Sequence, residues 1–76
     1  MSMKYKISVM DALKEKGYSS YYLRKNNILS QSTMYKLRNG IGVSWDNMER
    51  LCVMLDCQPG DIIQYEKDGQ GWQMPQ

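Results

Sequence analysis

The side chains best suited to bind a charged partner are concentrated in one short stretch, SQSTMYKLRN, at residues 30–39. Amide, hydroxyl and phenol groups donate hydrogen bonds, and Lys and Arg attract anions. No acid occurs in this stretch, although Glu–Lys pairs one turn apart stabilise ordinary exposed helices. The pattern therefore predicts a helix that binds a negatively charged partner through its outer side, with these residues there: Gln31, Ser32, Thr33, Tyr35, Lys36 and Arg38.

The charges of the chain are separated by region. Residues 16–45 contain five Lys or Arg and no Asp or Glu, whereas residues 46–68 contain six acids and two cations. The net charge is only +2, but this separation gives the domain an oriented electric field. We expect the basic part to face the anionic partner and the acidic part to point away from it.

The length of 76 residues is enough for one small domain, and 42% hydrophobic residues with 24% charged residues are typical of a globular chain. We expect the domain to cover residues 1–66. Residues 67–76 contain two Gly, a Pro and few apolar anchors, so we expect a loosely ordered tail there.

Capping residues and apolar spacing predict an all-α fold of five helices. Alternating residues from Tyr5 to Val9 also allow a short extended lead-in. We expect the first helix over about Val9 to Lys16, begun by Ser8 and Asp11 and stopped by Gly17, and the second to be capped by Ser19 or Ser20 and to run through Lys25. The third should lie between Ser30 and Asn39–Gly40. The fourth should be capped by Ser44 and have an inner stripe of Met48, Leu51, Cys52 and Leu55, and a short fifth should begin at Pro59.

The second and third helices are separated by a short turn, and the third is basic and rich in amides, which is the helix-turn-helix design. The runs ILSQSTMYKLRNG and VSWDNMERLCVMLDCQPGDIIQY resemble Cro/C1-type (Xre-like) helix-turn-helix regulators, in particular their small single-domain branch. The similarity covers roughly Val9 to Tyr65. It implies a five-helix lambda-repressor-like domain of bacterial or phage origin. Such a domain binds operator DNA with its third helix in the major groove, usually represses transcription, and is often a dimer on a two-fold site.

The resemblance also implies which residues contact DNA. Gln31 and Ser32 would reach base edges, and Lys36 would reach guanine or a phosphate. The family commonly has a small residue at position 24 and Gly at position 28, where this chain has Arg24 and Ile28, so we expect the turn to depend on Asn26 or Asn27. The full set of expected DNA-binding residues is Ser20, Ser30, Gln31, Ser32, Tyr35, Lys36, Arg38 and Asn39.

Two classes of function remain open from the sequence. The first is a sequence-specific regulator that binds double-stranded DNA, with a homodimer assembled through Ile62, Ile63, Tyr65 and Trp72. The second is a protein-interaction module, such as an antirepressor or an antitoxin-type partner, whose basic face binds an acidic protein. Only the DNA-binding function requires a steep salt dependence and a preference for one duplex.

An enzyme is not expected, because the chain has no His, no nucleophile–base pair and no phosphate-binding Gly loop. Cys52 and Cys57 do not form a C-x-x-C pair, so we expect two reduced thiols, with Cys52 buried, and no metal or cofactor. No small-molecule ligand is expected in so small a domain. No apolar run has the length of a membrane span, and no signal peptide is recognisable, so we expect no membrane association and a cytoplasmic location.

Overall fold

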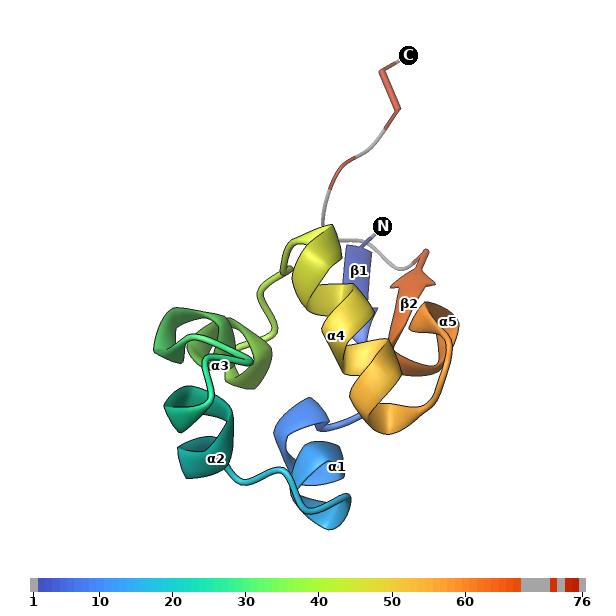
Figure 1. The fold of residues 1–76 in the computed structure, drawn as a ribbon. Helices are drawn as coiled ribbons and strands as arrows, with labels where there is room; N and C mark the ends of the chain where they lie inside the picture. Colours follow the sequence, from blue (N-terminus) through green and yellow to red (C-terminus); the bar gives the residue numbers. More distant parts are fainter. Residues whose placement is uncertain (1, 68–71, 73, 76) are drawn as a thin grey trace.

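The computed structural model describes residues 2–67, 72, 74 and 75. Five helices and two short strands form in this part of the chain (Figure 1). The all-α prediction is correct for the helices but wrong about the sheet, and residues 68–71, 73 and 76 of the expected tail lie outside the described residues. In chain order the elements are β1 (Ser2–Tyr5), α1 (Val9–Glu15), α2 (Ser20–Lys25), α3 (Gln31–Arg38), α4 (Trp45–Leu55), α5 (Pro59–Ile62) and β2 (Ile63–Glu66).

The two strands pair antiparallel and join the two ends of the domain, with Ser2 opposite Glu66 and Tyr5 opposite Ile63. An ion pair between Lys4 and Glu66 links neighbouring positions of the strands. The extended lead-in therefore exists, but it forms earlier than expected. Its partner was missed because four residues directly after a helix are too short for a period-2 pattern to be recognised.

Serine side chains begin three of the helices. Ser19, Ser30 and Ser44 each accept a hydrogen bond from the backbone N–H three residues later, over 3.1, 3.1 and 3.2 Å. Ser19, rather than Ser20, is thus the cap of α2. Ser8 differs from the prediction, because its hydroxyl donates to the Asp11 carboxylate over 3.0 Å and makes no cap bond.

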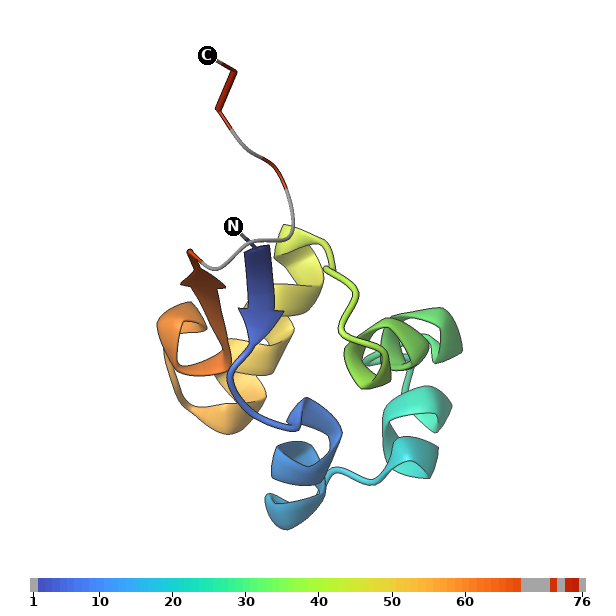
Figure 2. The ribbon, with the colours of Figure 1, turned by 180° about the vertical axis from the view of Figure 1, so that it is seen from behind.

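The core consists of nine buried apolar side chains contributed by all five helices and by the turn before α3. They are Val9, Leu13, Leu23, Leu29, Met34, Leu37, Leu51, Leu55 and Ile62. In Figures 1 and 2, α4 lies between the α2–α3 pair and the two-stranded sheet. The basic helices and the strands that join the chain ends therefore lie on different sides of α4.

Candidate nucleic-acid interface

The turn between α2 and α3 determines how the two helices are placed. Asn27 adopts the left-handed conformation, with φ of 54°, which agrees with the expectation that an Asn replaces Gly in this turn. The backbone N–H of Ile28 then donates to the Leu23 carbonyl over 2.9 Å, and Leu29 is buried directly before α3. A buried residue on each side of the turn holds the two helices against the same core.

Arg50 of α4 also supports this turn. Its Nη1 donates to the carbonyl of Ile28 over 2.6 Å. Arg24, by contrast, is exposed, and its side chain forms no hydrogen bond in the described structure. The role of Arg50 was missed because its partner lies 22 residues earlier, and no local pattern connects them.

Helix α3 has a buried side and an exposed side. Thr33, Met34 and Leu37 are buried, whereas Gln31, Ser32, Tyr35 and Lys36 are exposed. The placement of Thr33 on the outer side was therefore wrong. Thr33 lies one turn before Leu37 and points inward with it, where its Oγ1 accepts from Asn47 Nδ2 over 3.2 Å.

The ends of α3 are held by local hydrogen bonds. Ser30 Oγ accepts from the Thr33 N–H and lies 3.1 Å from Ser32 Oγ, so these two hydroxyls meet at the start of the helix. Asn39 Nδ2 donates to the Tyr35 carbonyl over 2.8 Å at the end of the helix. These bonds order the backbone beside the exposed side, while the side chain of Gln31 makes no hydrogen bond within the described structure.

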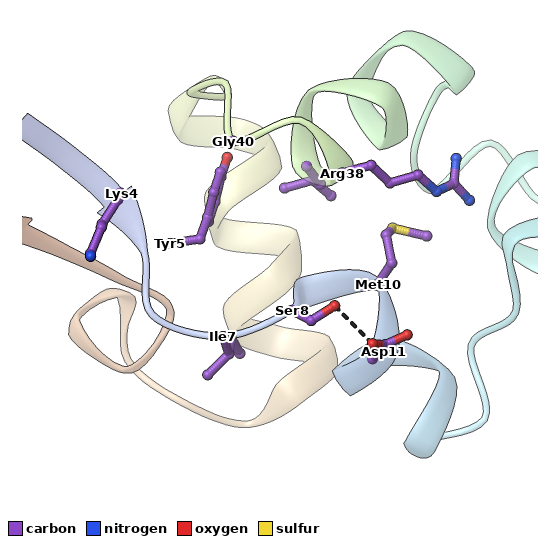
Figure 3. Close-up of a pocket in the computed structure, with 9 residues that line it drawn as sticks. Lys4, Tyr5, Ile7, Ser8, Met10, Asp11, Arg38 and Gly40 are labelled. Atoms are coloured by element: carbon purple, nitrogen blue, oxygen red, sulfur yellow. Dashed lines mark hydrogen bonds between the residues drawn. The ribbon is translucent and has the colours of Figure 1, made fainter.

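Arg38 lies apart from the other exposed residues of α3. It lies two positions after Lys36 in the sequence, which corresponds to a rotation of about 200° around the helix. Its Nη2 donates to Ser20 Oγ over 2.9 Å, so the last residue of α3 is bonded to the first residue of α2. Figure 3 shows the Arg38 side chain extending away from Tyr5 and passing close to Met10.

The eight expected site residues belong to α2, to α3 or to the residues that flank α3, and we call their exposed side chains the α2–α3 surface: Ser20, Ser30, Gln31, Ser32, Tyr35, Lys36, Arg38 and Asn39. All eight are exposed. Neither α2 nor α3 contains an acid, and Arg24 and Lys25 add two further cations. The acids Asp46 and Glu49 belong to α4 and not to the α2–α3 pair. The surface therefore combines hydrogen-bond donors with positive charge, which suits a polyanion.

A comparison with protein families shows which family the chain belongs to. A family model described as the Cro/C1-type HTH DNA-binding domain matches residues 7–68. The chain belongs to the Cro/C1-type helix-turn-helix family. Comparisons with curated proteins and with solved structures found no match. As a Cro/C1-type domain, the protein is a DNA-binding regulator in general terms, and α2 and α3 are its helix-turn-helix pair.

Other kinds of site find little support in the described residues. No group of three or more His, Cys, Asp or Glu gathers there in a way that could hold a metal ion. Cys52 and Cys57 are free and half-buried, so Cys52 is less buried than expected. Burial raises the pKa of the Cys57 thiol, with further contributions from Cys52 and nearby acids, and a thiol with a raised pKa is a weaker nucleophile at neutral pH. None of the helices in the described part of the chain combines the length and the hydropathy of a membrane span.

Proposed function

We propose that this Cro/C1-type protein is a sequence-specific transcriptional repressor that reads operator DNA with α3 in the major groove. The observation that supports this most is the exposed side of α3, which carries amide, hydroxyl, phenol and ammonium groups and no acid. Side chains of these types recognise base edges, because amides donate and accept at once and cations bind guanine or phosphate. A solvated helix without a partner has no need for this composition.

The arrangement assigns different tasks to different residues. Gln31 and Ser32 are in the first turn of α3, where a helix in the major groove contacts bases. Lys36 lies farther along the same exposed side and can reach a guanine. Ser30, Tyr35 and Asn39 flank these three residues and are suited to sugar–phosphate contacts, as is the Arg38–Ser20 pair on the other edge.

A single copy of α3 has eight residues and is about 12 Å long, so it contacts only a few base pairs. That is too little information to define one site in a genome. We therefore propose a homodimer on a two-fold operator, with two recognition helices in successive turns of the major groove, about 34–36 Å apart.

The test is selection of bound sequences from a random duplex library at two salt concentrations. The proposal predicts an enriched two-fold motif at both, and a binding constant for the selected duplex that falls steeply with salt. Enrichment of no motif would contradict sequence-specific binding. Weak, salt-insensitive retention of all duplexes would instead favour a function in binding an acidic protein.

A further inference from the structure

The two adjacent serines at the start of α2 have different hydrogen bonds. Ser19 Oγ accepts from the Tyr22 N–H and is the helix cap. Ser20 Oγ takes no part in capping and accepts from Arg38 Nη2 over 2.9 Å, across 18 residues of sequence. Ser20, the first residue of α2, is thus bonded directly to Arg38, the last residue of α3.

This hydrogen bond leaves both partners able to bind an anion. The guanidinium of Arg38 has five N–H donors, and the bond to Ser20 uses one of them. Because the oxygen of Ser20 is the acceptor, its hydroxyl proton remains free to donate. Arg38 forms no ion pair with a carboxylate in the described part of the chain, so its charge is not neutralised from within.

The surroundings of the pair are also suited to an anion. Arg38 and Ser20 line a surface depression of about 420 Å³ between α1 and α2. Lys14 adds a second cation to this depression, and among the described residues that line it Asp11 is the only acid. The carboxylate of Asp11 already accepts from Ser8. The formal charge of the depression is therefore positive.

We propose that Ser20 is a positioning residue, which holds the Arg38 guanidinium in place so that the two side chains bind one backbone phosphate of DNA together. A free Arg side chain would lose rotamer entropy on binding. Because the hydrogen bond to Ser20 already orders the Arg38 side chain, less entropy is lost when the phosphate binds. This inference rests on the proposed DNA-binding function and adds that the contribution of Ser20 depends on Arg38.

A double-mutant cycle tests this dependence. Affinities of the full chain, Ser20→Ala, Arg38→Ala and the double variant are measured on the selected duplex and on a scrambled duplex, over a series of salt concentrations. Ser20→Ala should weaken binding of both duplexes by about fivefold in the parent, but by less than about twofold when Arg38 is already Ala. Ser20→Thr keeps the hydroxyl and should restore most of the affinity. Melting temperatures show that each variant is folded.

Lys36 provides the matched control, because it lies on the other side of α3 and forms no hydrogen bond with Ser20 in the described structure. Ser20→Ala and Lys36→Ala should therefore have additive effects on the binding free energy. The inference is overturned if Ser20→Ala binds like the parent, or if it causes the same loss with Arg38 and without it. In either case the parent still selects its duplex, so the proposed function stands. Failure of the parent to prefer any duplex would overturn both.

Discussion

At the level of single residues, Gln31 has the chemistry most suited to reading a base. It is exposed at the first position of α3, and its amide can donate to and accept from adenine simultaneously. Gln31→Ala should relax the preference at one base position and weaken binding of the best site by about 1–3 kcal/mol. Titration of the selected duplex and its point variants measures both effects. Parent-like affinities across all these duplexes would show that Gln31 does not contact a base.

Arg50 has a structural task that the variant series can separate from DNA binding. Because its guanidinium bonds to the Ile28 carbonyl, Arg50→Ala should lower the free energy of unfolding by about 1 kcal/mol. Urea denaturation measures the change. Arg24→Ala is the matched control, since Arg24 is also exposed and its side chain forms no hydrogen bond in the described structure. Its unfolding free energy should stay within about 0.5 kcal/mol of the parent. Equal losses for both variants would contradict the role of Arg50.

At the level of elements, the turn between α2 and α3 depends on the left-handed backbone of Asn27. Asn27→Ala should destabilise the fold by about 1–2 kcal/mol, because a side chain with Cβ and no local hydrogen bond tolerates this conformation poorly. Asn27→Gly should cost much less, since glycine adopts positive φ freely. Thermal and urea unfolding measure the stability of the two variants relative to the parent. If Ala proved as stable as Gly, the turn would not need the left-handed residue.

The sequence was sufficient to predict the helices because their signals are local. Ser30 and Ser44 cap as expected, Gly17 and Gly40 follow helices with positive φ, and Met34 is buried at the predicted position. The features that the sequence did not predict join residues that are far apart in the chain. Pairing of β1 with β2 joins residues some sixty positions apart, and the link from Arg38 to Ser20 depends on how two helices pack. No periodicity within one segment contains that information.

The site was predicted in composition more completely than in geometry. The eight site residues were all placed on the surface, and the structure confirms their exposure. Thr33 was misplaced because a polar residue was taken as an outward one, although its hydroxyl is satisfied by Ser30 and Asn47 inside the domain. The contacts of the eight site residues with DNA remain predictions.

At the level of the whole molecule, the proposed dimer needs a surface away from the DNA. The C-terminal segment was expected to supply it, but Ile62 is fully buried in the core and is not available. Tyr65 and Trp72 are exposed, at 52% and 70%, and Ile63 is half-buried, so these three remain candidates. Sedimentation with the selected duplex should show two protomers for each duplex at saturation. One protomer for each duplex over a wide concentration range would contradict the dimer.

The orientation of α3 on DNA is the central claim, and Lys36 and Arg38 report on it from opposite sides of the helix. Salt titrations of Lys36→Ala and Arg38→Ala, each on the selected and the scrambled duplex, test it most directly. Arg38→Ala should weaken the binding of both duplexes about equally and should reduce the slope of log binding constant against log salt concentration by about one. Lys36→Ala should instead change which sequence is preferred. If Arg38→Ala changed the sequence preference and left the salt slope unaltered, α3 would be docked in a different rotation and the proposed base contacts would be wrong.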